Sequence, residues 1–201
     1  MKKEYIPEEF WNQKQEPNRL NQPQDIIDTH IRYISDNINN YESILDYGCG
    51  IGRTFDAYNQ THNIVGVDVS YSFKDRAIDK ANNLSLNFNW IHINDNKIPY
   101  PDKEFDTVVC CLVLMHIRPF EIIDLMKEFE RVSDKCVIIT KNPESSEDNK
   151  NVNKVKKYYT KRYAYDYLEL CRNNGLEYYN VEYYENQIMF CYKGREDDII
   201  T

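Results

Sequence analysis

Three alternating glycines follow a short apolar run and form the part of the sequence best suited to chemistry. They are Gly48, Gly50 and Gly52. Glycine lets the backbone turn tightly and lets a ligand approach the main chain closely. Asp46 stands just before them, where a carboxylate suits a ligand that carries a positive charge. We expect a strand at residues 43–47, a ligand-binding loop, and then a helix that carries Phe55 and Tyr58.

A second carboxylate ends the next apolar run, at residues 63–68. Asp68 lies 20 residues after Gly48, and an acid at that distance accepts hydrogen bonds from ribose hydroxyls in nucleoside-binding α/β folds. The alternative role for Asp68 is a cap for the next helix. The glycine pattern is not the dinucleotide fingerprint G-x-G-x-x-G, because Arg53 stands where its third glycine would be. A nicotinamide dehydrogenase is therefore disfavoured.

The remaining periodicity predicts strands alternating with helices. Helical spacing is found at residues 25–39, 70–82, 120–132 and 159–174. Further strands are predicted at residues 84–93, 108–112, 136–140, 176–185 and 187–193. This order predicts a doubly wound α/β fold with helices on both faces of a largely parallel sheet.

Composition limits the classes of function. The chain has 201 residues, which fits one domain, and its net charge of −8 argues against wide, non-specific binding to nucleic acid. A local basic cluster keeps a nucleic-acid acceptor open; it consists of Lys154, Lys156, Lys157, Lys161 and Arg162. The six cysteines include no C-x-x-C pair, so we expect reduced thiols in a cytoplasmic protein and no metal site. We also expect no signal peptide and no membrane span.

The glycine loop, Asp68 and the segment at residues 94–106 together resemble the class I S-adenosylmethionine-dependent methyltransferases, of the small, single-domain, methyltransferase type 11-like kind. The third feature has an acid, the triplet Ile98-Pro99-Tyr100, and then Phe105-Asp106 before a strand. The resemblance implies a Rossmann-like sheet of seven strands, mostly parallel, with an antiparallel last strand inserted between its neighbours. It divides the chain into residues 1–40, an N-terminal arm and helix covering the site, and residues 41–201, the methyltransferase domain.

The resemblance also implies an S-adenosylmethionine site at the carboxyl ends of the first four strands. Amides of the glycine loop would approach the methionyl carboxylate, helped by a helix dipole, and Asp46 would attract the ammonium. Asp68 would hold the ribose, Val69 would cover the adenine, and Asp95 or Asn94 would accept from its amino group. For Asp95 the alternative is a turn-forming role. The predicted cofactor-binding residues are Asp46, Tyr47, Gly48, Cys49, Gly50, Gly52, Asp68, Val69, Asn94, Asp95 and Cys111.

His116 is the best candidate for a general base, because it follows the fourth strand at the ligand end. We favour packing or contact with the substrate over catalysis for it. Asp106 precedes the fourth strand, so we expect a structural role there. Several aromatic residues could line a substrate pocket: Tyr5, Trp11, Tyr158, Tyr159 and Tyr163.

These expectations describe an S-adenosylmethionine-dependent methyltransferase (EC 2.1.1.-) that acts on a small molecule as a monomer or homodimer. Two alternatives stay open. One is a methyltransferase for protein or RNA, and the other is a non-catalytic subunit that binds the cofactor or a partner with the same fold.

Overall fold

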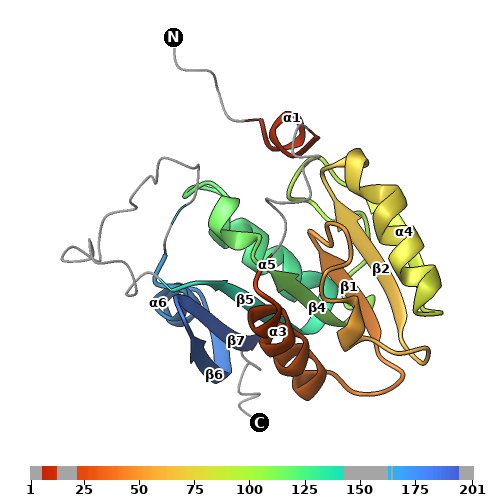
Figure 1. The fold of residues 1–201 in the computed structure, drawn as a ribbon. Coiled ribbons are helices and arrows are strands. Elements are labelled where there is room, and N and C mark those ends of the chain that lie inside the picture. Colours follow the sequence, from red (N-terminus) through yellow and green to blue (C-terminus); the bar gives the residue numbers. More distant parts are fainter. Residues whose placement is uncertain (1–5, 13–21, 143–162, 164, 195–201) are drawn as a thin grey trace.

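The structure is a computed structural model, and it describes residues 6–12, 22–142, 163 and 165–194 (Figure 1). Its centre is a seven-stranded sheet of order β3-β2-β1-β4-β5-β7-β6. The strands are β1 (Ser43–Tyr47), β2 (Asn63–Asp68), β3 (Asn87–His92), β4 (Phe105–Cys111), β5 (Ser133–Lys141), β6 (Leu176–Tyr184) and β7 (Gln187–Gly194). The α-helices are α1 (Pro7–Asn12), α3 (Gln24–Asn37), α4 (Lys74–Asn83), α5 (Ile122–Val132) and α6 (Tyr167–Asn173).

Strand direction confirms the predicted topology. The first five strands pair in parallel, whereas β7 is antiparallel to both of its neighbours, β5 and β6. Because β1, β2 and β4 run the same way, the residues that follow them meet at one edge of the sheet. The sheet order changes direction there, since β1 has β2 on one side and β4 on the other. Ligands of such sheets bind beyond the carboxyl ends at this place.

Two apolar cores lie on opposite faces of the sheet. Alternate β4 residues point to opposite sides, with Val108 in one core and Val109 in the other. The first core joins the sheet to α5 and α6 through buried residues such as Phe129. The second joins it to α3 and α4 through residues such as Tyr33. Helices therefore cover both faces, as predicted (Figure 1).

The prediction of a helix directly after the glycine loop is wrong. A three-residue 3₁₀ turn, η1 (Phe55–Ala57), stands in its place. The side chain of Asn59 then accepts a 2.9 Å hydrogen bond from the amide of Thr61 and turns the chain toward β2. Too few residues remain between loop and turn for an α-helix, whose first turn is costly to form. No helix dipole therefore points at the loop from this side.

Other boundaries move by a few residues. Strand β4 begins at Phe105 rather than at residue 108, and α5 passes directly into β5. Helix α6 begins at Tyr167, where Asp166 accepts a 2.9 Å hydrogen bond from the amide of Glu169. The start predicted at residue 159 lies outside the described residues. The division of the chain at residue 40 stays a prediction.

All six cysteines lie in the described part of the chain, and none forms a disulfide. Within the described residues, no group of three or more His, Cys, Asp or Glu side chains could hold a metal ion. None of the described helices has the length and apolar character needed to cross a membrane.

Candidate cofactor site

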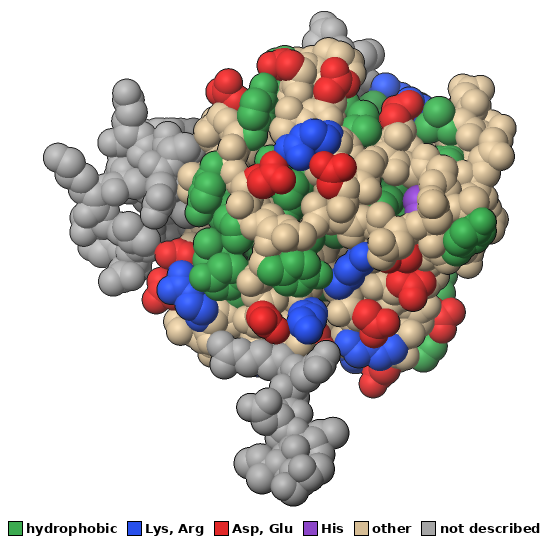
Figure 2. Space-filling view, turned by 90° about the horizontal axis from the view of Figure 1, so that it is seen from below, with side chains coloured by type: hydrophobic (Ala, Val, Ile, Leu, Met, Phe, Trp, Pro, Cys, Tyr) green, Lys and Arg blue, Asp and Glu red, His purple; other side chains and the backbone are tan. Residues whose placement is uncertain are grey.

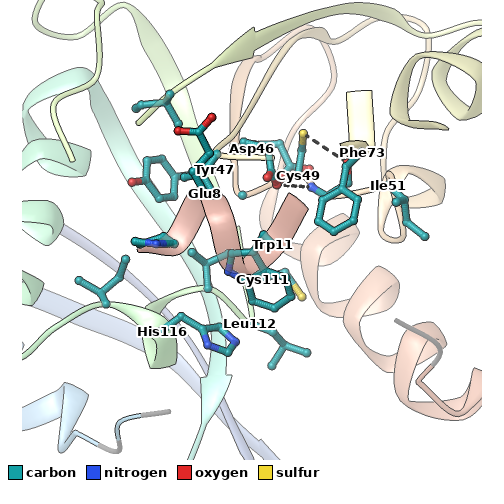
Figure 3. A pocket seen from close by; sticks show the side chains of 18 of the residues that line it. Glu8, Trp11, Asp46, Tyr47, Cys49, Ile51, Phe73, Cys111, Leu112 and His116 are labelled. Carbon is teal, nitrogen blue, oxygen red and sulfur yellow. Dashed lines mark hydrogen bonds between the residues drawn. The ribbon is translucent and has the colours of Figure 1, made fainter. Parts of the chain in front are cut away.

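A cavity of about 280 Å³ opens at the carboxyl ends of β1, β2 and β4 (Figure 3). It brings together most of the residues that the sequence singled out. Lining residues from the first two strands and the loop are Asp46, Tyr47, Gly48, Cys49, Gly50 and Asp68. Those from the following segments are Val69, Asn94, Asp95, Cys111 and His116. Gly52 is not among the lining residues.

The glycines of the loop are required by its backbone. Gly48 and Gly52 have φ of +73° and +76°, a region that residues with a side chain rarely adopt. A Cβ at Gly48 would overlap Val113, and one at Gly52 would lie 2.6 Å from the Phe55 ring. Gly52 therefore serves the packing of η1 rather than the cavity.

Most amides of the loop already have acceptors inside the protein. The amides of Gly48 and Cys49 donate to the carbonyl of Val67, at 2.8 and 3.1 Å. The amide of Gly52 donates to the carbonyl of Cys49 at 3.0 Å. The contact of these loop amides with the methionyl carboxylate stays a prediction. No helix dipole assists it, because no α-helix directly follows the loop.

Asp46 is a buried acid at the end of β1. Its Oδ2 accepts a 2.8 Å hydrogen bond from the hydroxyl of Tyr58. Burial raises the pKa of Asp46 to about 7; the Tyr58 hydrogen bond opposes this shift, and the nearby charge of Asp68 adds to it. Such a carboxylate gains much from a cation that enters the cavity, because the cation stabilises its charged form.

Asp68 is also buried, and it joins two segments of the site. Its Oδ2 accepts from the amide of Gly50 and its Oδ1 from the amide of Ser70, both at 2.8 Å. Burial raises its pKa to about 6, although these amides favour the charged form. Asp68 thus forms a turn after β2 and also fixes the glycine loop. The alternative proposed for it, a cap for the next helix, is wrong, because in the described part of the chain neither the 3₁₀ turn Tyr71–Phe73 nor α4 has a side-chain cap. Each carboxylate oxygen has a second lone pair that a ribose hydroxyl can use.

The segment after β3 forms the other end of the cavity. Oδ1 of Asp95 accepts a 3.0 Å hydrogen bond from the amide of Lys97, which is the turn-forming arrangement considered for this residue. The hydroxyl of Tyr47 donates to Oδ1 of Asn96 at 3.4 Å. Arg131 of α5 holds the segment from outside, donating to the carbonyl of Ile98 at 3.0 Å.

Arg53 is a cavity residue to which the sequence analysis gave no role. Its Nε is buried and has no acceptor in the described part of the chain. Burial raises the pKa of Asp46 to about 7 and that of Cys111 to about 11. The positive charge of Arg53 lowers both pKa values and so opposes the effect of burial. The signal in the sequence was its place directly after the last glycine, where we read it only as a departure from another motif.

Helix α1 lies over the cavity and carries Glu8 and Trp11 into its lining (Figure 3). The Trp11 indole lies 5.0 Å from the His116 ring, centre to centre and edge to face. Oδ1 of Asn12 accepts a 2.9 Å hydrogen bond from the Ser70 hydroxyl. The expected place of Trp11 in a pocket is therefore observed, whereas Tyr163 is not among the lining residues and Tyr5, Tyr158 and Tyr159 lie outside the described residues.

Asp106 lies at the opposite end of the sheet, where its Oδ2 accepts from the amide and the hydroxyl of Ser43, both at 2.7 Å. Its role is structural, as expected.

The sequence of this region matches a known family. Residues 44–135 match the model of a methyltransferase domain. The chain carries a class I S-adenosylmethionine-dependent methyltransferase domain. The match spans β1 to the start of β5, and therefore includes the strands whose ends form the cavity.

Solved structures share the fold of this methyltransferase. The PH0226 protein of Pyrococcus horikoshii OT3 is 21% identical, with a TM-score of 0.70 over 86% of this chain and 91% of its own. The CcbJ methyltransferase of Streptomyces caelestis is 14% identical, with a TM-score of 0.71 over 92% and 95%. Magnesium protoporphyrin IX methyltransferase of Synechocystis PCC 6803, solved with bound S-adenosylhomocysteine, is 17% identical, with a TM-score of 0.64 over 85% and 83%. No curated protein sequence matches the chain.

The polar side chains that line the cavity of the methyltransferase suit the polar groups of S-adenosylmethionine. The cofactor has an ammonium, a carboxylate, a sulfonium, a ribose and an adenine. Two buried acids suit the ammonium and the ribose hydroxyls, and the buried Nε of Arg53 suits the carboxylate. The residues present therefore match the handles of this cofactor.

Proposed function

We propose that this methyltransferase transfers a methyl group from S-adenosylmethionine to a small-molecule acceptor. The observation that carries the proposal is the meeting of Asp46, Asp68 and His116 around one cavity, within a segment that matches a methyltransferase domain. The class of reaction follows from the family, and the roles of individual residues are our proposal.

In this proposal different residues contact the methionyl end and the nucleoside end of the cofactor. Asp46 attracts the ammonium and Arg53 the carboxylate of the methionyl end. Asp68 accepts from the ribose, while Val69 covers the adenine. Asp95 or Asn94 accepts from the adenine amino group, and the loop amides and Cys111 close the methionyl side. Asp95 has Oδ2 for this contact, because the turn at Lys97 uses Oδ1.

When bound, the cofactor supplies a methyl group activated by its positively charged sulfur. The protein must then place the acceptor atom in line and exclude water. Helix α1 excludes water, because it lies over the cavity. The contact of Trp11 with His116 and the hydrogen bond from Ser70 to Asn12 hold it there. His116 holds a proton-accepting nitrogen at the same place, so it can take the proton that an acceptor O–H or N–H loses.

A small acceptor is favoured by the shape and charge of the protein. The cavity lies under α1, where a folded macromolecule has little access. Figure 2 shows the face turned away from α1, where Lys and Arg side chains are interspersed with Asp and Glu without a broad cationic area, and the net charge of the chain is −8. Tight non-specific binding of nucleic acid needs such an area. The basic cluster at residues 154–162 lies outside the described residues.

The test is a calorimetric titration with S-adenosylhomocysteine, with the wild type beside Asp68→Ala. We expect micromolar binding, weakened by about 1–3 kcal/mol in the variant, the usual cost of leaving polar partners unmet. Failure of the wild type to bind would refute the proposal. Binding without turnover of any acceptor would favour the non-catalytic subunit, and salt-sensitive binding of RNA would favour a nucleic-acid acceptor.

A further inference from the structure

One carboxylate in the cavity has no counterpart among the handles of the cofactor. The described lining contains the carboxylates of Glu8, Asp46, Asp68 and Asp95. This inference rests on the proposed function, which uses the last three for the ammonium, the ribose and the adenine. Glu8 remains, and it belongs to α1, which covers the cavity, rather than to the edge of the sheet. It is therefore the one carboxylate of the described lining that the proposed function leaves for the acceptor.

Glu8 lies beside a fixed aromatic ring. Trp11 follows it by three residues on α1, so the two side chains share one side of the helix. The indole packs against three other rings, with centres 5.0 Å from His116, 5.2 Å from Phe10 and 6.4 Å from Phe73. An aromatic surface held next to a carboxylate attracts a cation, because the ring face and the carboxylate are both negative.

The charges around Glu8 strengthen this attraction. Arg53 is the only Lys or Arg among the described residues that line the cavity, and it lies near Asp46 at the methionyl end. His92 approaches Glu8 from outside, with Nε2 3.7 Å from the carboxylate and 3.1 Å from the carbonyl of Val69. Since a carbonyl only accepts, this nitrogen donates to Val69 at the shorter of the two distances. Among the described residues that line the cavity, no Lys or Arg other than Arg53 competes for the Glu8 carboxylate.

An anionic acceptor fits this part of the cavity poorly. A carboxylate or phosphate placed beside Glu8 would lose water and meet a like charge, and Arg53, the only Lys or Arg in the described lining, is assigned to the methionyl end. A positively charged amine would gain from Glu8 and from the Trp11 ring. We propose that the acceptor is a planar aromatic compound with a positively charged amine, its ring against Trp11 and its ammonium toward Glu8.

The test uses three probes that share one ring and differ in charge: tryptamine, tryptophol and indole-3-propionate. Each is titrated by calorimetry into the full chain saturated with S-adenosylhomocysteine. We expect tryptamine to bind roughly tenfold more tightly than indole-3-propionate, with tryptophol between them. Glu8→Gln should bring the three affinities to within about threefold. Glu9→Gln is the matched control, because Glu9 is an exposed residue of the same helix outside the cavity lining, and it should keep the wild-type order.

Each outcome decides the matter. Equal affinities in the wild type, a preference for the anion, the same order in Glu8→Gln, or no binding of any probe would overturn this inference. A preference for the anion would direct attention to the basic cluster at residues 154–162. Binding of S-adenosylhomocysteine is measured in the same samples first, so a failure of the proposed function is recognised separately.

Discussion

The hydroxyl of Tyr58 donates a 2.8 Å hydrogen bond to Oδ2 of Asp46, and both residues are buried. The two residues lie on either side of the glycine loop, and η1 brings Tyr58 back to the end of β1. The missing helix is thus replaced by a turn that supplies a partner for the acid of the first strand.

This hydrogen bond should tune cofactor binding. Tyr58→Phe removes a donor that favours the charged form, so the pKa of Asp46 should rise above its present value of about 7. We expect S-adenosylhomocysteine to bind about fivefold to tenfold more weakly at pH 7, the net size of one ordinary hydrogen bond, and to recover at pH 9. Calorimetry at the two pH values checks this. An equal loss at both would show that Tyr58 acts through packing alone.

The buried acid should also make stability depend on pH. The pKa of Asp46 is raised from its ordinary 3.8 to about 7, so the folded state holds a proton that the unfolded state releases between these values. The stabilising contribution is therefore complete below about pH 4 and is lost as the pH rises through 7. Between pH 5 and 7 the free energy of unfolding should fall by about 2 kcal/mol on account of this group.

Asp46→Asn isolates that effect, because an amide of the same shape still accepts from Tyr58 and does not titrate. Urea unfolding from pH 5 to 8 should show a shallower decline for the variant than for the wild type. Asp68, whose pKa is also raised, supplies the remaining slope. Parallel curves for the two proteins would contradict the burial of an ionisable Asp46.

The parts of the fold that repeat a simple period were predictable from the sequence. The strands and helices α3 and α5 follow apolar spacing, which depends only on which face each element buries. The position of β7 came from the family resemblance, since pairing between strands far apart in the chain leaves no local pattern.

The glycine loop shows why other parts were not predictable. A helix that carries Phe55 and Tyr58 was expected after the glycine loop, but these residues are three apart, a spacing that a single 3₁₀ turn satisfies equally well. Arg53 was overlooked for a related reason, since its role depends on a buried Nε that only the folded chain reveals. The position of α1 over the cavity likewise depends on contacts such as Asn12 to Ser70, 58 residues apart.

Arg53 should select for the carboxylate of the cofactor. We expect the wild type to bind S-adenosylhomocysteine far more tightly than 5′-methylthioadenosine, which lacks the amino-acid end, and Arg53→Gln to reduce that difference by about 1.5–3 kcal/mol. Arg76→Gln, at an exposed position of α4, is the charge-matched control and should change nothing. If Arg53→Gln weakens both ligands equally, Arg53 supports the structure of the site rather than the carboxylate.

The requirement for glycine at position 48 has two separable causes. Gly48→Ala would place a residue with a side chain at φ +73° and drive its Cβ into Val113. We expect a loss of about 2–4 kcal/mol of stability, because backbone strain of 1–3 kcal/mol adds to the steric overlap. Val113→Ala in the same chain should recover the steric part and leave the strain. Urea unfolding of the two single variants and the double variant measures the coupling. Additive losses would mean that Val113 moves aside freely and that the backbone alone demands glycine.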